Sequence, residues 1–340
     1  MLWHAANVGT MPSKNGKSLK LLSTVLLSLL LIGSSRSQDP VETVRIESDL
    51  VDLKVSVLGF ASAADAALLD QKDFEVLEDG AKQQIAFFAA SDVPFDLLLL
   101  LDVSGSTSGK LKLIRNSAKR FVDAARPVDR LAIMTFTDQP YLLSKFSLDR
   151  RQLKKDIDYI DDAYGGTNFW DSLDDVLSSM VRNQTRRTAI VVMTDGVDNA
   201  LPGVKGEGSQ TTFETLLENV QRSESLVFPI YLDTEKKNEK NPEIPHSAYV
   251  TSHEQLSQIA ASSGTTLYHA ARLQDLDNVY AQVIRDLGRI YSIGYKPSNR
   301  ALDGKWRQVE VHLVGRPNLQ ARTRRGYYAK QAAASDTEKK

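Results

Sequence analysis

The chain has 340 residues, of which 42% are hydrophobic and 25% are charged, and its formal net charge is −1. This composition is typical of a globular protein and excludes a collagen-like or strongly disordered chain. Residues 1–37 contain four basic residues and no acidic ones, so a chain that starts at Gln38 has a charge of about −5, which argues against nucleic acid as a general partner. The basic cluster Arg322, Arg324 and Arg325 is expected to be a solvated strand face. The sequence contains no cysteine, so no disulfide can stabilise the folded chain.

The amino terminus has the pattern of an export signal. Three lysines, Lys14, Lys17 and Lys20, precede an apolar run over residues 21–32, and small residues precede a cleavage position at Gln38. The apolar run is too short to span a bilayer easily. We therefore expect residues 1–37 to be a signal peptide, with Met11 as the better start, and the protein to be periplasmic, at the cell surface or secreted. An uncleaved signal would instead anchor the chain in a membrane.

Residues 41–92 predict a small antiparallel β module. One strand alternates apolar and polar positions, and a second begins at Phe74. Asp79 and Gly80 form a turn that leads into a return strand through Ile85 and Phe87. Residues 61–69 are rich in alanine and are compatible with either a loop or a helical turn. The apolar positions of the first strand are Val51, Leu53, Val55 and Val57.

From residue 94 the pattern changes to strands that alternate with amphipathic helices, as βαβ units require. Two further segments, 131–136 and 141–146, are joined by a short turn and predict a hairpin with one antiparallel strand. We therefore predict an α/β domain over 94–288, with a doubly wound, mostly parallel sheet and one antiparallel edge strand. The predicted buried strands are 96–101, 189–194, 226–232 and 265–270, and the predicted helices are 111–125, 169–181, 213–220 and 273–287.

The rest of the chain supplies one long loop and more strands. Residues 233–252 are charged and contain proline, which predicts a mobile surface loop before a helix that starts near His253. Residues 289–329 return to strand character, and the polar tail 330–340 is expected to be disordered.

One stretch, residues 97–110 with the sequence LLLLLDVSGSTSGK, is the first candidate for a functional site. Five leucines indicate a strand buried on both faces, and Asp102, Ser104 and Ser106 follow at its carboxyl end. Oxygen-bearing side chains at this spacing can converge on a hard cation such as Mg²⁺. Alone, the serines are better explained by capping of the next helix. A phosphate loop and a nucleophile elbow are both excluded, because the glycine spacing is one residue short and Thr107 occupies the central position.

Two more loops are expected at the same edge of the sheet. Residues 165–168 precede a predicted helix and contain Thr167, and residues 194–196 follow a predicted strand and contain Asp195. Ligands of open α/β sheets bind beyond the carboxyl ends of the strands, where all three loops would meet. Each residue alone also has a simple structural explanation, as a helix cap or a turn residue.

The three loops in the order DxSxS, GGT and TDG resemble the metal-ion-dependent adhesion site (MIDAS) of the von Willebrand factor A domain family. The resemblance covers residues 94–288. It implies that Ser104, Ser106 and Thr167 are near or direct ligands of Mg²⁺, or of Mn²⁺ or Ca²⁺, and that Asp102 and Asp195 act directly or through water. It also implies an open coordination position for a carboxylate of a protein partner.

The flanks resemble those of exported bacterial proteins with a von Willebrand factor A-related domain first described from Acidobacteria. The resemblance rests on residues 73–80 before the domain and extends the match to residues 41–329. It leads us to expect that the flanks 41–92 and 289–329 form one sandwich-like module from which the A domain projects. After the domain, the matching segments are Tyr295-Lys296-Pro297, Asp303-Gly304 and Arg325-Gly326-Tyr327-Tyr328.

These patterns favour an exported, non-enzymatic adhesion module that binds an acidic group of a protein through a divalent cation. A metal-assisted hydrolase is the alternative, because an open-coordinate cation can activate water, but no general base is evident. The five histidines form no metal-spaced pair along the sequence, and the dipeptide His253-Glu254 lacks the second histidine of a zinc protease helix. A purely structural metal site is a third possibility. Helix 273–287 is expected to be a static packing helix, with a two-state shift as the alternative, and the oligomeric state is not predicted.

Overall fold

The computed structural model describes residues 50–59, 69–89, 93–107, 111–161, 165–182, 184, 186–235 and 244–331, apart from the side chains of Ser106 and Leu273. The predicted signal peptide, most of the alanine-rich segment and residues 332–340 of the predicted tail lie outside these residues. The chain divides into the units Met1–Glu47 and Ser48–Lys340, and the second contains every element described below.

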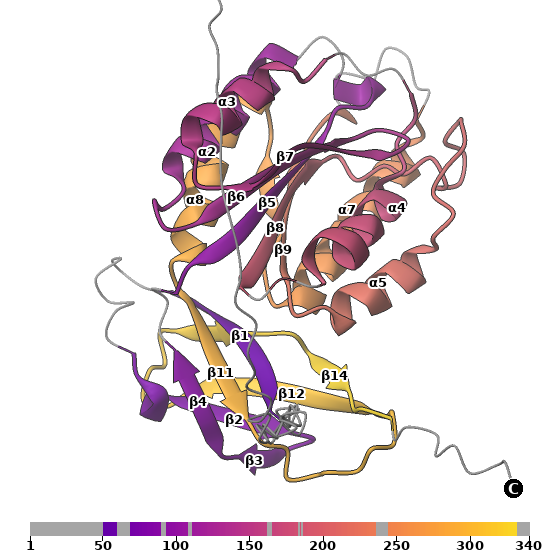
Figure 1. Cartoon of the computed structure of the whole chain (residues 1–340). Coiled ribbons are helices and arrows are strands. Elements are labelled where there is room, and N and C mark those ends of the chain that lie inside the picture. Colours follow the sequence, from indigo (N-terminus) through magenta and orange to yellow (C-terminus); the bar gives the residue numbers. More distant parts are fainter. Residues whose placement is uncertain are drawn as a thin grey trace, which may run out of the picture. The chain divides into compact units, whose positions relative to one another are not determined.

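A six-stranded sheet forms the centre of the α/β domain (Figure 1). Neighbouring strands run parallel from β10 to β6, and β7 pairs antiparallel with β6 at the edge. This arrangement confirms the predicted mostly parallel sheet with an antiparallel edge strand. In spatial order the strands are β10 (Tyr268–Ala270), β9 (Leu226–Leu232), β8 (Arg187–Thr194), β5 (Phe95–Asp102), β6 (Arg130–Phe136) and β7 (Pro140–Ser147).

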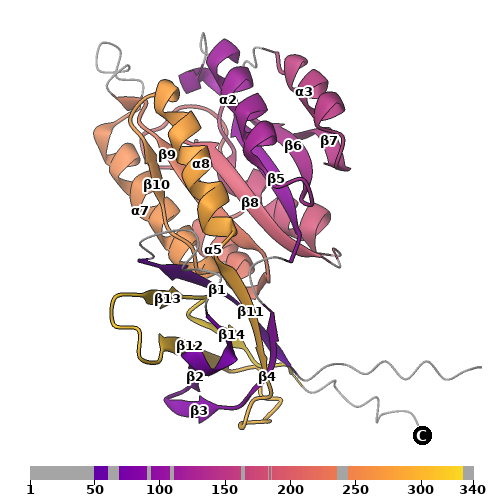
Figure 2. The ribbon, with the colours of Figure 1, turned by 90° about the vertical axis from the view of Figure 1, so that its left-hand side faces the viewer.

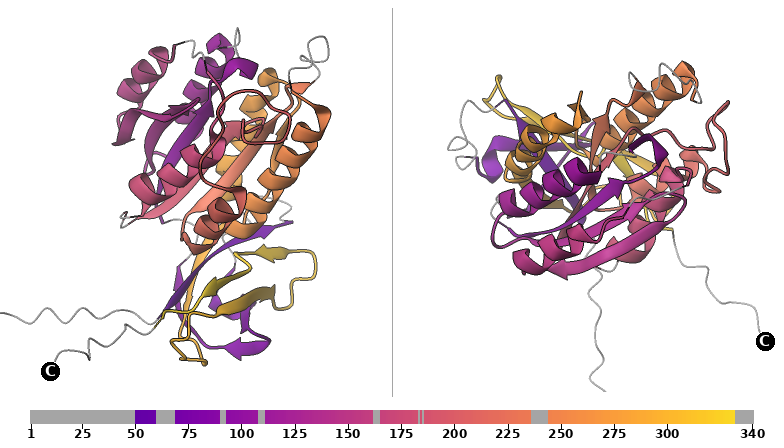
Figure 3. Two further views of the ribbon diagram at one scale, coloured as in Figure 1. Left: turned by 90° about the vertical axis from the view of Figure 1, so that its right-hand side faces the viewer. Right: turned by 90° about the horizontal axis from the view of Figure 1, so that it is seen from above.

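The leucine run explains why β5 occupies the middle of this sheet. Leu97, Leu99 and Leu101 pack on one face, and Leu98 and Leu100 pack on the other. Because side chains alternate along a strand, only a continuous apolar run can fill both faces, and each buried leucine contributes about 1.5–3 kcal/mol. The first face is covered by α2 (Leu111–Ala124), α3 (Arg150–Asp158) and α8 (Leu276–Leu287). The second is covered by α4 (Phe169–Asp175), the π-helix η3 (Val176–Val181), α5 (Phe213–Arg222) and α7 (His246–Ser263), as Figure 3 shows.

Helix α3 was not predicted from the sequence. Its segment RRQLKKDID is mostly charged, and only Leu153 and Ile157 are buried. The helix nevertheless has a clear start, since the carboxylate of Asp149 accepts hydrogen bonds from the backbone N–H groups of Arg151 and Gln152. Two apolar positions and one cap are therefore enough to fix a helix that a hydrophobic stripe alone does not indicate.

The predicted loop 233–252 and the predicted helix start near His253 are wrong in part. Helix α7 begins at His246, directly after Pro245, whose fixed φ suits the start of a helix. Ala248, Tyr249 and Ser252 are buried within the segment that was expected to be a loop. Residues 236–243 lie outside the described part of the chain. Strand β10 is also shorter than predicted, because it begins at Tyr268 rather than at residue 265.

Two four-stranded sheets make up the β module, which combines strands from both flanks of the α/β domain. Strand β1 (Val51–Leu58) pairs antiparallel with β11 (Ile290–Tyr295), and β2 (Phe74–Glu78) pairs antiparallel with β12 (Trp306–Leu313). The short helix η1 (Gln71–Asp73) precedes β2. The sheet orders are β13-β1-β11-β4 and β14-β12-β2-β3, with β3 at Ala81–Gln83, β4 at Ile85–Ala89, β13 at Gln320–Arg322 and β14 at Gly326–Tyr328.

The predicted single return strand after Gly80 is two strands. The turn lies where expected, with positive φ at Asp79 and Gly80, and β3 pairs back on β2. After Gln84 the chain enters the other sheet, where β4 pairs with β11. The module therefore has strands that change sheet, which an alternating apolar pattern cannot reveal.

A buried carboxylate joins the two flanks inside this module. Glu78 is 2% exposed, and one of its oxygens accepts hydrogen bonds from the hydroxyl groups of Tyr295 at 2.7 Å and Tyr327 at 2.8 Å. Phe74 and Tyr291, which come from opposite flanks, have ring centroids 5.1 Å apart. Among the residues that the structure describes, no helix is long and apolar enough to cross a membrane.

Candidate metal centre

The first loop of the predicted site begins at the last residue of β5. Asp102 is fully buried, and its Oδ1 accepts a hydrogen bond from the backbone N–H of Ser104 at 3.0 Å. The hydroxyl of Thr107 donates to the carbonyl oxygen of Ser104 at 2.8 Å and closes the short helix η2 (Gly105–Thr107). Ser104 is 1% exposed. The side chain of Ser106 lies outside the described part of the chain.

The second loop is tied to the third through Asn199. The N–H of Thr167 donates to Asn199 Oδ1 at 3.2 Å, and the N–H of Asn199 donates to the carbonyl oxygen of Thr167 at 2.9 Å. Gly166 leaves room for this contact, because a Cβ at this position would lie 2.1 Å from Asn199 Nδ2 and would displace the Asn199 side chain. Asn168 occupies the N-cap position of α4 but its side chain makes no capping hydrogen bond.

Asp195 in the third loop is held by buried hydroxyl groups. It is 1% exposed, and its Oδ2 accepts a hydrogen bond from the hydroxyl of Thr234 at 2.7 Å. Its Oδ1 accepts from the N–H of Val197 at 3.1 Å, and its carbonyl oxygen accepts from the hydroxyl of Ser252 at 2.9 Å. Gly196, with φ of 73°, makes the turn against α7. The segment after β9 and helix α7 thus both position this loop.

Direct contacts bring the three loops together. Asp102 Oδ2 accepts a hydrogen bond from the hydroxyl of Thr194 at 2.6 Å, which joins the first loop to the third. A Cβ at Gly105 would lie 3.9 Å from the carbonyl oxygen of Gly165, so the first and second loops are adjacent. We call the set Asp102, Ser104, Ser106, Thr167 and Asp195 the candidate metal centre.

The electrostatics of this centre are unfavourable for two bare carboxylates. Burial, and then the negative charge of Asp195, raise the pKa of Asp102 to about 7, although hydrogen bonds from Ser104 and Thr194 act in the opposite direction. Within the described residues, no basic side chain is among the groups that shift the pKa of Asp102. A cation bound beside the two carboxylates would relieve this repulsion.

The donor set fits a hard divalent cation. It consists of carboxylate and hydroxyl oxygens, which Mg²⁺ prefers over softer donors. No group of three or more His, Cys, Asp or Glu side chains that could hold a metal occurs in the described part of the chain, so hydroxyl groups and water would have to complete the coordination. A divalent ion bound there would supply positive charge and an acceptor site for one more anionic oxygen.

Several residues that build the centre were not predicted. Thr194 was noted only as part of its loop, Thr234 and Ser252 were placed in the predicted surface loop 233–252, and Asn199 carried no signal. Thr234 and Ser252 are fully buried. Their positions depend on β9 and α7 arriving at the same rim, which no local pattern in the sequence encodes.

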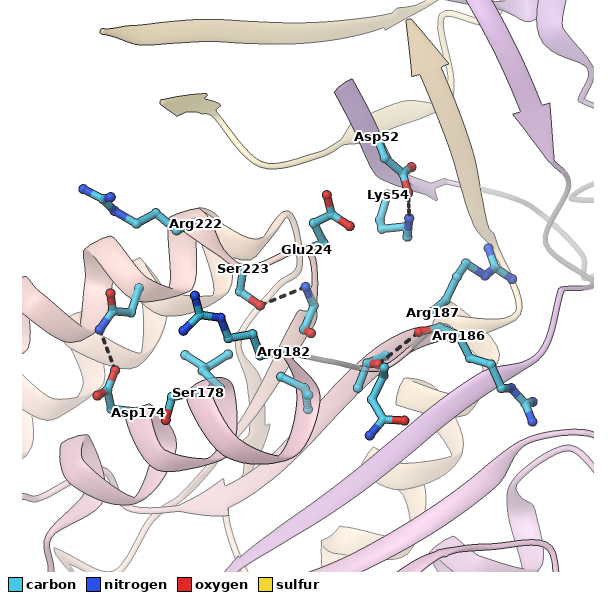
Figure 4. Close-up of a pocket in the computed structure, with 16 residues that line it drawn as sticks. Asp52, Lys54, Asp174, Ser178, Arg182, Arg186, Arg187, Arg222, Ser223 and Glu224 are labelled. Atoms are coloured by element: carbon cyan, nitrogen blue, oxygen red, sulfur yellow. Dashed lines mark hydrogen bonds and ion pairs between the residues drawn. The ribbon is translucent and has the colours of Figure 1, made fainter. Parts of the chain in front are cut away.

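A separate cavity of about 640 Å³ lies away from the predicted ligands (Figure 4). Its walls come from β1, the end of η3, the start of β8 and the end of α5, and none of the predicted ligands lines it. Some of its charged side chains are already paired with each other, as Lys54 is with Asp52. The cavity is therefore not the site that the sequence indicates.

The family model of the von Willebrand factor type A domain matches residues 97–197. This part of the chain is therefore similar to a von Willebrand factor type A (VWA) domain. The match runs from β5 to the loop after β8, so it contains all five residues of the candidate metal centre. We refer to the α/β domain as the VWA-like domain below. The finer resemblance to the exported bacterial proteins first described from Acidobacteria stays a prediction.

Several solved structures are similar to the VWA-like domain at low identity. BatB from Bacteroides thetaiotaomicron is 12% identical, covers 57% of this chain and 99% of its own, and has a TM-score of 0.43. The vWF domain of the pilus tip protein Mfa5 from Porphyromonas gingivalis is 14% identical, with 57% and 94% covered and a TM-score of 0.42.

A third structure is proximal thread matrix protein 1 from the mussel byssus with a zinc-occupied MIDAS motif. It is 16% identical and covers 61% of this chain and 48% of its own, with a TM-score of 0.45. Similarity at this level does not transfer a function to the chain. The comparison with curated proteins gave no match.

Proposed function

We propose that the VWA-like domain binds an acidic group of a protein partner through a divalent cation held at the candidate metal centre. The observation that carries this proposal is the convergence of three loops around two buried carboxylates whose charges repel each other. Ser104, Ser106 and Thr167 would contribute hydroxyl oxygens, and Asp102 and Asp195 would balance the charge of the ion. Mg²⁺ is the expected ion, with Mn²⁺ and Ca²⁺ as substitutes.

The chemistry of the donor set supports a binding role. Mg²⁺ takes six oxygen ligands, so a set with two carboxylates and three hydroxyl groups leaves room for water or for an incoming carboxylate. Thr194 and Thr234 each donate a hydrogen bond to one carboxylate and thereby help to orient it, while each oxygen atom keeps acceptor capacity for the ion. An acidic side chain of another protein would be attracted to the open position by the residual positive charge.

We also propose how the binding domain is carried. The VWA-like domain comprises residues 94–288, and the flanks 41–92 and 289–329 form the β module that supports it. We propose that residues 1–37 direct export, so that the candidate metal centre meets partners in the periplasm, at the cell surface or outside the cell. Limited proteolysis that left a stable 94–288 core while the flanks dissociated would contradict the proposal that the two flanks form one module.

The metal site is tested by titrating the purified protein with Mg²⁺ and Mn²⁺ while its stability is measured. At about a hundredfold excess over the dissociation constant, a bound ion should add about 2.7 kcal/mol to the free energy of unfolding. Asp102→Ala and Thr167→Ala should lose this gain. Glu207→Gln is the matched control, because it removes an exposed carboxylate from the segment next to Asn199 without touching the centre.

Partner binding is tested separately. Proteins of the exporting organism should be retained by the immobilised wild-type protein with Mg²⁺ and released by a chelator, and Thr167→Ala should retain none of them. If the variants gain as much stability from the ion as the wild type does, the metal site is wrong. If the ion stabilises the protein but nothing is retained, the metal is structural. Turnover of an ester or phosphodiester panel would favour the metal-assisted hydrolase.

A further inference from the structure

Two histidines that are 16 residues apart in the sequence face each other at the edge of the sheet. His253 lies on α7, and His269 lies on β10, which pairs with β9. These three elements are labelled in Figure 2. Their Nε2 atoms are 3.2 Å apart, and both side chains are solvent-accessible. The ring of Tyr231 contacts both imidazoles, with centroid distances of 5.1 Å to His253 and 4.8 Å to His269. The tyrosine therefore supports both rings from one side.

The distance between the two nitrogens is the one expected for two ligands of a single metal ion. Zinc–imidazole bonds are about 2.0–2.1 Å long, so two such ligands in a tetrahedral site have their nitrogens about 3.3 Å apart. A neutral pair that shares one hydrogen can also adopt this separation. The pair is thus already arranged so that an ion could replace the shared proton without a large movement of either ring.

The surroundings favour the neutral imidazoles that a metal requires. Burial, and then the charge that His253 can carry, lower the pKa of His269, while the nearby carboxylate of Asp233 acts in the opposite direction. A negative charge close to His269 also attracts a cation. Both effects make the pair a better ligand than two isolated surface histidines.

We propose that His253 and His269 bind a divalent transition-metal ion at a site distinct from the candidate metal centre. The protein supplies two imidazole nitrogens, since no third His, Cys, Asp or Glu joins them in the described part of the chain, and water or a donor from another molecule fills the other positions. Imidazole suits Cu²⁺, Ni²⁺ and Zn²⁺, whereas the oxygen ligands of the candidate metal centre suit Mg²⁺. This inference does not depend on the proposed function.

The test uses Cu²⁺ as the probe, because it binds nitrogen ligands most strongly among these ions. The purified protein, prepared without a histidine tag and with Asp102→Asn to disable the other centre, is titrated by calorimetry and examined by electron paramagnetic resonance. His253→Gln and His269→Gln are compared with His312→Gln, an exposed histidine on β12 that leaves the same number of histidines in the chain.

The parent and His312→Gln should bind one Cu²⁺ per chain with nitrogen hyperfine coupling. Removal of either paired histidine should weaken Cu²⁺ binding by at least about tenfold. Mutation of a residue that only hydrogen-bonds to a metal ligand already lowers metal affinity about 10–100-fold, and loss of the ligand itself should lower it at least as much. Equal binding by all variants, or a spectrum with oxygen ligands only, would overturn the proposal. His253 is partly exposed on a helix, so His253→Gln decides the outcome even if His269→Gln lowers stability.

Discussion

Replacing Asp102 by asparagine should make the metal-free protein more stable at neutral pH. The side chain keeps its size, its Oδ1 can still accept from the N–H of Ser104, and its Nδ2 can donate to the hydroxyl of Thr194 in place of the bond that the carboxylate accepts. The pKa of Asp102 is raised in the folded state, so the folded protein binds the proton more tightly than the unfolded chain does. The carboxylate therefore costs nothing well below pH 4, and its cost grows as the pH rises through 7.

The size of the effect follows from the same values. The difference between a pKa of about 7 and the ordinary value of 3.8 corresponds to a loss of about 4 kcal/mol in the free energy of unfolding, at 1.36 kcal/mol for each pKa unit. Most of this cost accumulates between pH 4 and pH 7. The stability advantage of Asp102→Asn over the wild type should therefore grow by about 2–3 kcal/mol between pH 5 and pH 8.

Urea unfolding in the presence of a chelator, followed by tryptophan fluorescence, measures this difference at each pH. The protein has three tryptophans, of which Trp170 is buried beside the second loop. At about a hundredfold excess over the dissociation constant, Mg²⁺ should narrow the difference by about 2.7 kcal/mol, because only the wild type gains from the ion. A difference between the proteins that is independent of pH would refute the raised pKa of Asp102, and an equal gain from Mg²⁺ would refute its role as a ligand of the ion.

Three further predictions concern the supports of the site and of the β module. Thr234→Val removes the hydroxyl that donates to Asp195, so it should lower the free energy of unfolding by about 1–3 kcal/mol and weaken Mg²⁺ binding. Thr234→Ser keeps a hydroxyl and should retain the wild-type stability and Mg²⁺ affinity. Urea unfolding measures the stability, and calorimetry measures the affinity. Gly166→Ala forces a Cβ to 2.1 Å from Asn199 Nδ2 and should lower the melting temperature by several degrees, while Gly105→Ala, whose Cβ meets nothing closer than 3.9 Å, should change it little. Glu78→Gln weakens the acceptor of two tyrosine hydroxyl groups and should lower the free energy of unfolding, measured in urea, by about 1–3 kcal/mol. An unchanged urea midpoint would show that these hydrogen bonds do not hold the flanks together.

The sequence predicts the central strands well because their burial on both faces leaves a strong local pattern. The run of leucines in β5 and the segment Ile190 to Met193 in β8 are apolar at consecutive positions, so they can be neither surface loops nor amphipathic helices. By contrast, α3 and the first turns of α7 carry few apolar residues. They are stabilised by a cap at Asp149 and by packing of Tyr249 against the sheet, and the packing depends on tertiary contacts.

In the candidate metal centre, too, the sequence predicts the features that have a local pattern but not those that depend on tertiary packing. The three loops could be predicted because each follows or precedes a recognisable element and contains glycine beside an oxygen-bearing side chain. Thr234 and Ser252 could not, because each lies in a segment whose local composition indicates a solvated loop. The pairing of His253 with His269 was also missed, since their separation along the chain fits no metal motif and only the packing of α7 beside β10 brings them together.

The chain enters and leaves the VWA-like domain through neighbouring strands of the β module. Strand β4 ends at Ala89 just before β5, β11 begins at Ile290 just after α8, and the two strands are hydrogen-bonded with Ser292 opposite Ala89. A ligand that pulls on the candidate metal centre therefore loads two covalent connections at once, at the same end of one strand pair. Tension on the domain would divide between both flanks instead of passing through a single linker.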